Sequence, residues 1–408
     1  MTRATLPLPR RDAGLEQLQA FVPQMGSRYA RERNEDRGPG QHAAVSRLSP
    51  LVRHRLLLEA ELVSAALGQH RAEEAEKFIQ EVCWRSYWKG WLQQHPEIWS
   101  RYRQQQALDH AAVTGHRVRA AQLAAACAGD TGLPGFDDWA RELLATGYLH
   151  NHARMWFASI WIFTLRLPWT LGADFFLRHL LDADAASNTL SWRWVAGLQT
   201  RGKHYLARAE NIHRYTRGRY ALNGRLDETA DPLPADDPPP RVPLASLAAA
   251  DPGRPSALLL HGEDLHLESL LAEQPGRWTA LPVLSLRLPP PAGSGAAQQA
   301  WREAAQDDAE ARLRAAGHPV VTVTATELEA ALAGQGARQL LLAELAQGEL
   351  ADALQPLLAR VTASGVSVRP LRRRWDAVFW PHATRGFFAL RERIPALLQT
   401  LGLLDRVR

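Results

Sequence analysis

Apolar and polar residues alternate in two different ways along this chain. Up to about residue 225, apolar residues recur every three or four positions, which is the spacing of helices that bury one face. Clear examples are residues 72–94 and residues 136–147, where Gly147 marks a helix end. The first part of the chain, residues 1–225, is therefore predicted to be an all-helical domain.

Two further helices are predicted from a start signal and from the absence of a break. Residues 49–67 are expected to form one helix, with Ser49 as its N-cap and Pro50 at its first position. Residues 158–167 carry the β-branched residues typical of a strand. The apolar run continues from Met155 without a turn residue, however, so a helix is predicted there as well.

A segment rich in Pro, Asp and Ala, residues 226–255, is predicted to be an extended linker. After it, short apolar runs typical of strands alternate with helical stretches such as residues 297–317. The runs are residues 257–261, 280–288, 319–325, 339–345, 366–371 and 377–381. This alternation predicts a doubly wound parallel α/β domain over residues 256–408.

The composition is that of a globular protein, with 46% hydrophobic and 22% charged residues in a chain of 408. The sequence contains no apolar run long enough to span a membrane and no apolar signal-peptide core near its start. Cys83 and Cys127 are the only cysteines, which excludes a disulfide scaffold and a four-cysteine cluster. No metal site is predicted, and the cytoplasm is the default location.

Charge and tryptophan content add to this picture. The sequence has 14 Trp residues, an unusually high number for its length. Residues 1–225 hold 30 Lys and Arg against 21 Asp and Glu, whereas the rest of the chain is net acidic. A basic helical part is typical of proteins that bind polyanions such as nucleic acid. An ordinary solvated surface explains a moderate excess of this size equally well.

Polar residues gather at two places within the apolar helical pattern. Asn151 and Arg154 lie three positions apart, so they share one face of a helix. Asp182, Asp184 and Asn188 fall between two apolar helices. Buried charges of this kind need partners, because an unpaired one is costly. Either they pair with each other as helix caps and ion pairs, or they bind a flat polar heterocycle.

Four segments around these residues resemble the flavin-binding helical domain of the photolyase/cryptochrome family. They are SRLSP (46–50), FIQEVCWRSYW (78–88), TGLPGFDDWARELLATGYLHNHARM (131–155) and LLDADAASNTLSWRW (180–194). Family members carry their α/β antenna domain before the flavin domain, so the resemblance implies a swapped order here. Whether the α/β domain holds a second, light-harvesting chromophore or only covers the flavin domain stays open.

The resemblance implies that FAD is the cofactor and assigns its contacts by position. Ser49 would lie at a helix start, where backbone N–H groups favour phosphate, and Asn188 would lie near the flavin N5. The implied FAD-binding residues are Ser46, Arg47, Ser49, Arg85, Asn151, Arg154, Asp182, Asp184 and Asn188.

The resemblance also implies a substrate-side set that holds a flipped cyclobutane pyrimidine dimer. Trp84 and Trp194 would stack on the dimer, and Glu81 would hydrogen-bond a pyrimidine edge. Asn151 and Met155 complete the set and favour the cyclobutane dimer as the lesion. The alternatives are a surface charge for Glu81 and core packing for the two indoles.

Trp192 and Trp169 match the first two members of the family's electron-transfer triad. The third position falls near His116, in a segment without Trp, so the third step is missing or rerouted. Candidate substitutes are Trp161, Trp156 and Tyr148.

The expected function is light-dependent repair of cyclobutane pyrimidine dimers in DNA, single-stranded or duplex, by electron transfer from photoexcited reduced FAD. The first alternative is a cryptochrome-like blue-light receptor without repair activity, and the second is a flavoprotein with another redox role. The sequence predicts no oligomeric state.

Overall fold

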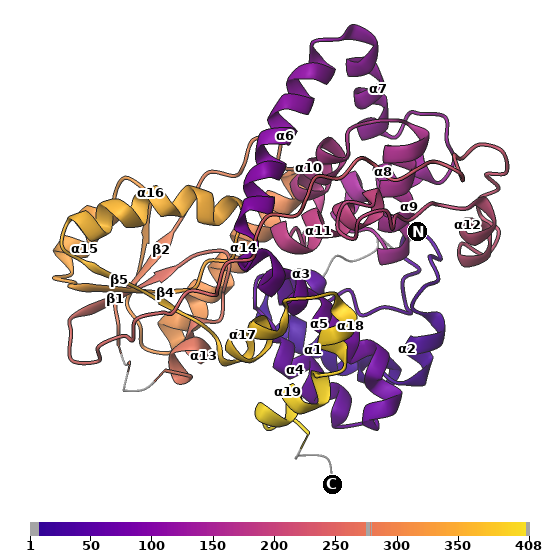
Figure 1. Cartoon of the computed structure of the whole chain (residues 1–408). Helices are drawn as coiled ribbons and strands as arrows, with labels where there is room; N and C mark the ends of the chain where they lie inside the picture. Colours follow the sequence, from indigo (N-terminus) through magenta and orange to yellow (C-terminus); the bar gives the residue numbers. More distant parts are fainter. Residues whose placement is uncertain (1–7, 275–277, 279, 405–408) are drawn as a thin grey trace.

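The computed structural model describes residues 8–274, 278 and 280–404, and it consists of a helical body beside a small α/β unit (Figure 1). No helix in these ranges is long and apolar enough to cross a bilayer. The first helices along the chain are α1 (Arg11–Phe21), α2 (Ser27–Glu32), α3 (Ser49–Arg53), α4 (Glu59–Leu67), α5 (Ala72–Gln93), α6 (Pro96–Thr114), α7 (Arg117–Ala128), α8 (Phe136–Thr146), α9 (Asn151–Ser159), α10 (Trp169–His179), α11 (Ala185–Ala196) and α12 (Ala209–Tyr215), with short turns η1 (Val22–Gln24) and η2 (Ile160–Thr164).

Most of the predicted helices are confirmed. The helix α5 covers nearly the whole predicted stretch, and α8 ends at Gly147, whose φ of 64° is the left-handed conformation that glycine adopts easily. Residues 158–167 are helical through Thr164, because α9 continues into η2, a π-helical turn. Tight packing of this apolar stretch in the core outweighs its β-branched composition.

The prediction of one helix over residues 49–67 is wrong in two respects. Leu48, not Ser49, is the residue before the first helical position of α3. The helical run also breaks at Arg55, whose backbone lies in the left-handed region with φ of 55°. A non-glycine residue holds this conformation only where its surroundings stabilise it, and for Arg55 they are the buried carboxylates described below.

The α/β unit is built on five parallel strands in the order β3-β2-β1-β4-β5. The strands are β1 (Ser256–Leu260), β2 (Val283–Leu286), β3 (Val320–Val323), β4 (Gln339–Ala343) and β5 (Ser367–Leu371). Five of the six predicted strand runs are thus confirmed. All residues of β1, β2 and β4 are buried, as expected for central strands covered on both faces.

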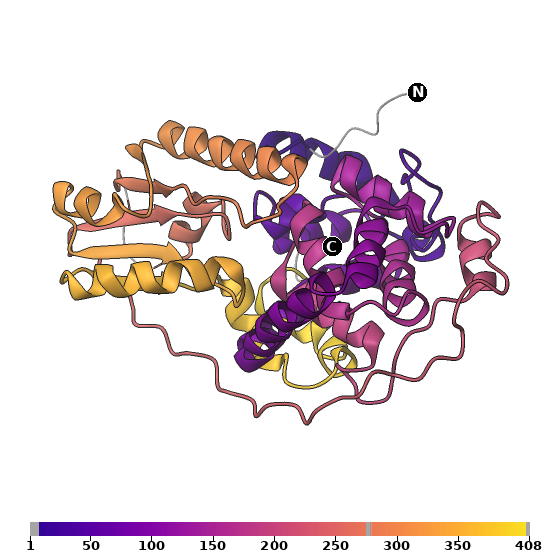
Figure 2. The ribbon, with the colours of Figure 1, turned by 90° about the horizontal axis from the view of Figure 1, so that it is seen from above.

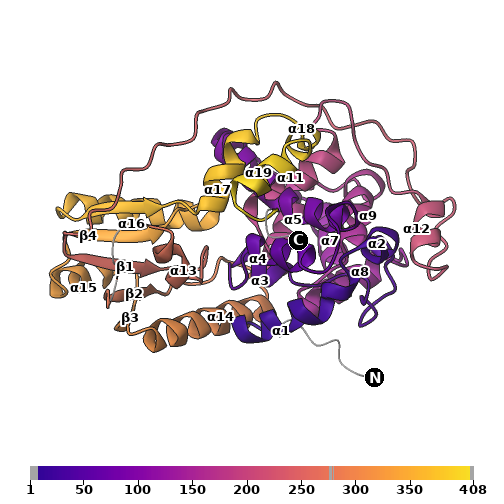
Figure 3. The same cartoon turned by 90° about the horizontal axis from the view of Figure 1, so that it is seen from below.

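Helices cover both faces of this sheet (Figure 3). Leu259, Leu284 and Leu342 belong to a core shared with α15 (Leu328–Gly334) and α16 (Glu349–Ala363). Leu258 and Leu341 face the other way, toward α13 (Leu267–Ala272) and α14 (Ala296–Ala315), and this core is continuous with that of the helical body. One face of the sheet and the helical body therefore share one apolar interior, while the other face has a core of its own.

The predicted sixth strand, residues 377–381, is wrong. These residues lie in α17 (Arg374–Phe379) and in the 3-10 turn η3 (Trp380–His382). Trp375 and Phe379 are one helical turn apart and stack at 4.4 Å, so the aromatic content that suggested a strand instead supports a helix.

The C-terminal helices pack on α5 in the helical body, where Figure 1 draws them in yellow beside the indigo helices. They are α17, α18 (Phe387–Arg391) and α19 (Ile394–Thr400). The indole Nε1 of Trp375 donates to Ser86 Oγ at 2.7 Å, and Gln94 Nε2 donates to the Trp380 carbonyl at 2.9 Å. A Cβ on Gly90 would lie 2.8 Å from the Cα of Trp380, so Gly90 allows this close approach.

Between α12 and β1 the described residues form neither helix nor strand, and this segment runs along one side of the molecule (Figure 2). It is attached at a few points, such as the hydrogen bond from Val242 N to the Gln94 carbonyl at 2.8 Å. The assignment of residues 226–255 as the boundary between two domains stays a prediction.

A cluster of buried charges joins the helical body, the sheet and the C-terminal helices. Arg55 Nη2 donates to both carboxylate oxygens of Asp376, at 2.8 and 2.6 Å, and lies 3.4 Å from Asp264 through Nη1. Arg373 donates to both oxygens of Asp264, at 2.6 and 2.8 Å. Burial alone would raise the pKa of Asp264, but Arg373 and Arg55 hold it well below its ordinary value. Asp264 is therefore ionised, and it lies between the two guanidinium groups.

Removing Asp376 tests this cluster. We expect Asp376→Ala to lower the free energy of unfolding by about 3–5 kcal/mol, because it leaves Arg55 buried without its bidentate partner. The matched control is Glu329→Ala, which breaks the exposed Glu329–Arg360 pair and should cost about 0–1 kcal/mol. Urea unfolding followed by circular dichroism measures both, and equal losses would contradict this role of the cluster.

A second buried polar group, His150, caps the start of α9. Its Nδ1 accepts from the backbone N–H of His152 at 3.2 Å, and its Nε2 donates to the Arg33 carbonyl at 3.0 Å. These contacts need the neutral imidazole. Burial lowers the pKa of His150 to about 3, with His42 and His152 adding to the shift and Asp36 opposing it.

This shift predicts acid sensitivity. The unfolded chain binds the His150 proton below about pH 6.5, whereas the folded protein excludes it until about pH 3. The free energy of unfolding should therefore decrease as the pH is lowered from about 6.5 to about 3. His150 should contribute up to about 1.4 kcal/mol per pH unit to this decrease. His150→Gln should make the slope of the free energy of unfolding against pH shallower, by the amount that the uptake of one proton contributes. Substitution of the exposed His110 by Gln should leave the slope unchanged. Chemical unfolding between pH 7 and pH 4.5 measures the slopes.

Candidate functional site

The predicted flavin residues converge from four elements of the helical body. Arg154 on α9 donates to both oxygens of Asp182, at 3.1 and 3.0 Å, and through Nε to the Leu149 carbonyl at 2.9 Å. The Ser49 hydroxyl, at the start of α3, also hydrogen-bonds Asp182. Burial raises the pKa of Asp182, but Arg154, Arg85 and this hydroxyl bring it below its ordinary value. Asp182 is thus an ionised, rigidly held acceptor.

Asp184 has a similar environment two residues later. Its Oδ1 accepts from the backbone N–H of Ser187 at 2.7 Å and so caps α11. Burial is opposed by Lys89, Arg85 and Arg53, which hold the pKa of this carboxylate far below its ordinary value. Arg85 Nη1 lies 3.4 Å from Asp184 Oδ2. The capping and ion-pair roles that the sequence allowed for these residues are therefore present.

The remaining predicted flavin residues border this cluster. Asn188 lies one turn after Asp184 on α11, is buried, and donates through Nδ2 to the Ala173 carbonyl at 2.8 Å. Ser46 Oγ accepts from Leu48 N at 3.4 Å, and Arg47 has a φ of 54°. These residues form the turn before α3, which brings Ser49 to Asp182. Asn151, the first residue of α9, is exposed.

The cluster has unused hydrogen-bonding capacity. Arg85 Nη1 is fully buried and has no hydrogen-bond partner in the described parts of the chain, and the same holds for the Ser187 hydroxyl. A buried donor without an acceptor is uncommon unless a ligand supplies one. Asp184 also lines a cavity of about 510 Å³ together with Arg53 and Lys89, whereas Arg85 and Ser187 are not among the residues that line it. A cofactor with carbonyl or phosphate oxygens fits this donor set.

Two residues that the sequence did not reveal, Lys89 and Glu263, connect this cluster to the sheet. Lys89 donates to Glu263 Oε1 at 2.5 Å, and Arg53 Nη1 lies 3.0 Å from Glu263 Oε2. Glu263 follows β1, so the cavity opens at the carboxyl end of this strand, where α/β sheets commonly bind ligands. Lys89 lies four residues after Arg85 on α5, a helical spacing that could have revealed it.

The substrate-side residues are more dispersed. Glu81 on α5 forms an ion pair with Arg33 at 2.5 Å. Burial nevertheless raises the pKa of Glu81 above its ordinary value, although Arg33 opposes the shift. Met155 is half-buried, one helical turn after Asn151. Glu81 is therefore neither a free surface charge nor part of the flavin cluster.

The two indoles of the substrate-side set have different neighbours. Trp84 stacks on Phe387 of α18, with ring centroids 3.7 Å apart and planes within 12°. Trp194 stacks on Tyr205 at 5.7 Å. Both indoles are half-buried. Phe387 was missed because no local signal connects the C-terminal segment with α5.

The two electron-transfer candidates lie deep in the body. Trp192 is 2% exposed and Trp169 is 9% exposed. The Trp192 ring lies against α10 at Gly172, where a Cβ would come within 2.3 Å of it. Trp169 is one turn earlier on the same helix, so both indoles adjoin α10.

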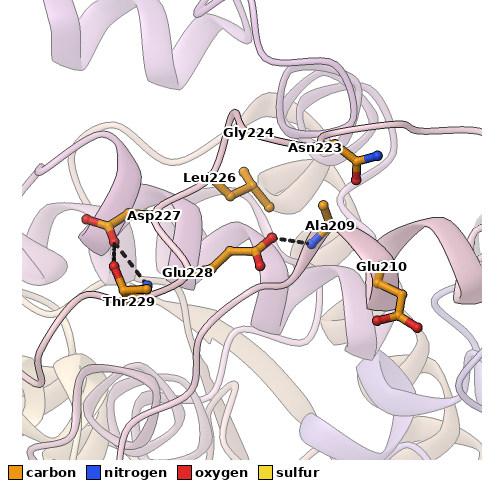
Figure 4. Close-up of a pocket in the computed structure, with 8 residues that line it drawn as sticks. All are labelled: Ala209, Glu210, Asn223, Gly224, Leu226, Asp227, Glu228 and Thr229. Atoms are coloured by element: carbon orange, nitrogen blue, oxygen red, sulfur yellow. Dashed lines mark hydrogen bonds between the residues drawn. The ribbon is translucent and has the colours of Figure 1, made fainter.

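A second hollow, of about 570 Å³, lies beside α12, away from these residues (Figure 4). Its Glu228 carboxylate accepts from Ala209 N at 2.8 Å, and Asp227 accepts from Thr229 N at 3.2 Å. These carboxylates serve the local backbone, and the hollow includes no predicted site residue.

Comparison with known proteins gives the same assignment for the helical part. Residues 78–218 match the family model described as the FAD binding domain of DNA photolyase. The deoxyribodipyrimidine photo-lyase of Streptomyces griseus is 37% identical over 163 residues, which cover 38% of this chain and 33% of that protein. The protein of the same name from Thermus thermophilus is 35% identical over 203 residues, which cover 47% of this chain and 44% of that protein.

Among solved structures, a bacterial class III photolyase from Agrobacterium tumefaciens is 26% identical, with a TM-score of 0.43 over 52% of this chain and 44% of that one. The chain thus spans less than half the length of the two curated relatives named above. Within that span, the matched segment contains Arg85, Arg154, Asp182 and Asp184. Residues 78–218 of this chain are therefore similar to the FAD binding domain of DNA photolyase, which supports FAD as the cofactor.

Proposed function

We propose that this chain is a light-dependent DNA repair flavoprotein that splits cyclobutane pyrimidine dimers. The observation that supports it most is the buried cluster of Arg154, Asp182, Asp184 and Arg85. In it Arg85 Nη1 is ion-paired with Asp184 at 3.4 Å but makes no hydrogen bond within the described residues. A rigid, charged cluster with a spare donor is suited to hold a flavin and its phosphates in one orientation.

Each group of residues has a role in this proposal. Asp182 and Arg154 fix the flavin edge, while Arg85 and the start of α3 hold the pyrophosphate. Reduced FAD held by these residues would supply light-driven electron transfer to the dimer. Glu81, which pairs with Arg33, would hydrogen-bond a pyrimidine edge of the dimer and stabilise its radical anion. Trp84, Trp194, Asn151 and Met155 would line the slot for the flipped dimer.

The partner in this proposal is UV-damaged DNA. The basic helical part carries an excess of Lys and Arg, which suits phosphate binding independent of sequence. The α/β unit, which follows the helical part in the sequence, would cover the flavin domain. Glu263 from the α/β unit and Asp184 from the helical body line the same cavity.

A second candidate, a cryptochrome-like photoreceptor without repair activity, is favoured by one observation. Phe387 covers one face of Trp84, a face on which a dimer base could otherwise stack. If the slot is closed by α18, the chain would absorb blue light without binding a lesion.

The flavin site is tested by Asp182→Ala. It leaves Arg154 buried without its bidentate partner and removes the acceptor for Ser49, so flavin affinity should fall at least about tenfold. The control Asp227→Ala removes an ion pair with Arg166 outside the cluster and should keep its flavin. Absorbance of the purified proteins and FAD titration measure how much flavin each variant binds. Full occupancy in Asp182→Ala would mean that Asp182 only pairs with Arg154 and does not hold the flavin.

Repair is tested with dimer-containing oligonucleotides, single-stranded and duplex, under blue light. We expect the wild-type protein to split the dimer, and Trp84→Ala to weaken lesion binding about tenfold, because stacking on a base contributes roughly 1–3 kcal/mol. The paired variants are Phe387→Ala, which uncovers Trp84, and Phe388→Ala, its exposed neighbour. Repair that appears only in Phe387→Ala would identify the photoreceptor as the native function.

A further inference from the structure

From Trp169, which like Trp192 adjoins α10, a row of packed aromatic rings continues into α6. Trp169 lies 5.5 Å from Tyr102, and Tyr102 lies 5.3 Å from Trp99, measured between ring centroids. Tyr102 and Trp99 are one turn apart on α6, which lies beside α10 (Figure 1). Contacts this close are those of directly packed aromatic rings. The row thus leads from the flavin domain toward the α/β unit.

Trp99, at the end of this row, is hydrogen-bonded to a carboxylate. Its Nε1 donates to Oδ2 of Asp352 at 2.8 Å. Asp352 is exposed and lies in the first turn of α16, so it comes from the α/β unit. Arg103 lies 5.8 Å from the Trp99 ring. A carboxylate within hydrogen-bond reach is positioned to take the indole proton and pass it to solvent.

The start of α16 is held in place by ion pairs to the helical body. Glu349 pairs with Arg178 on α10 and with Arg103 on α6, the latter at 3.2 Å. These contacts bring Asp352 to Trp99 and hold it there. The proton acceptor is therefore part of the packed interface and does not depend on a loop.

Trp161 and Tyr102, the aromatic neighbours of the two buried indoles, offer no such exit. Trp161 contacts Trp192 at 6.2 Å, but its Nε1 donates to the backbone carbonyl of Pro168, which cannot accept a proton. The Tyr102 hydroxyl lies 3.5 Å from the Thr170 carbonyl, and burial raises its pKa well above the ordinary value. Tyr102 therefore connects Trp169 with Trp99, and it is not the residue on which the oxidised state is stabilised.

We propose that Trp99, reached from Trp169 through Tyr102, is the terminal electron donor of the row, and that Asp352 accepts its indole proton. This rests on the flavin site of the proposed function. The oxidant would be photoexcited FAD in its oxidised form, not the reduced form that would donate an electron in repair. Trp192 loses one electron to it, Trp169 reduces oxidised Trp192, and Trp99 reduces oxidised Trp169. Loss of the Nε1 proton to Asp352 leaves a neutral tryptophan radical on Trp99. Arg103 favours this loss, because a nearby cation disfavours a charged indole.

The experiment is flash excitation of the full-length protein loaded with oxidised FAD, followed by transient absorption and electron paramagnetic resonance. In the wild type we expect a neutral tryptophan radical. Trp99→Phe should abolish it, and Asp352→Asn should slow the deprotonation at least about tenfold, with the cationic radical persisting meanwhile. Asp352→Glu should restore part of the rate.

The controls separate this route from its alternatives. Trp91→Phe changes an indole that stacks on His95, outside the row, and Trp161→Phe closes the other branch. Both should behave as wild type. A wild-type neutral radical in Trp99→Phe, or a loss in Trp161→Phe, overturns the proposal. Trp192→Phe should remove all radical signals. If it does not, the proposed donor next to the flavin is wrong. If Trp192→Phe removes the signals but Trp99→Phe does not change them, only the new terminal step is overturned.

Discussion

The paired burial of Arg55, Arg373, Asp264 and Asp376 is the contact on which the arrangement of the molecule depends. Each of these charges is nearly inaccessible to water, and they come from α3–α4, the end of β1 and the start of α17. A buried charge is tolerated only with a partner, so none of the three segments can move away alone. This explains why Arg55 keeps a left-handed backbone that interrupts the first predicted helix. It also explains why the C-terminal helices return to α5.

A second set of buried charges links this framework to the candidate site. Lys89 and Arg53 share Glu263, which follows β1, and Arg53 also approaches Asp184 at 3.8 Å. The carboxylate that caps α11 and the carboxylate at the edge of the sheet therefore belong to one electrostatic system. Within it Arg85 has a buried N–H that no acceptor in the described residues meets. A ligand that brings an acceptor would complete this system, and its affinity would depend on the fit between helical body and sheet.

The sequence predicted the features that repeat locally and missed those that join distant segments. Helical spacing located α5 and α8, and the alternation of apolar runs located all five strands. Residues 377–381 were misassigned because β-branched and aromatic residues occur in both strands and buried helices, and only the packing of Trp375 on Ser86 decides between them. The stack of Phe387 on Trp84 leaves no local signal at all. Among the site residues, Arg154, Asp182 and Asp184 come together as their spacing suggested, whereas Glu81 pairs with Arg33 outside this cluster.

The position of Asp352 changes the role that the α/β unit can have. A unit that only covers the flavin domain would need complementary surface charge, and α16 provides it through Glu349, which pairs with Arg178. It would not need a carboxylate directed at the indole N–H of a buried tryptophan. Oxidation of an indole increases the acidity of that N–H. A carboxylate oxygen at 2.8 Å could remove the proton before the electron returns and so keep the charges separated. On this argument the helical body and the α/β unit would be coupled in chemistry as well as in folding, because one electron route draws its rings from the helical body and its base from the α/β unit.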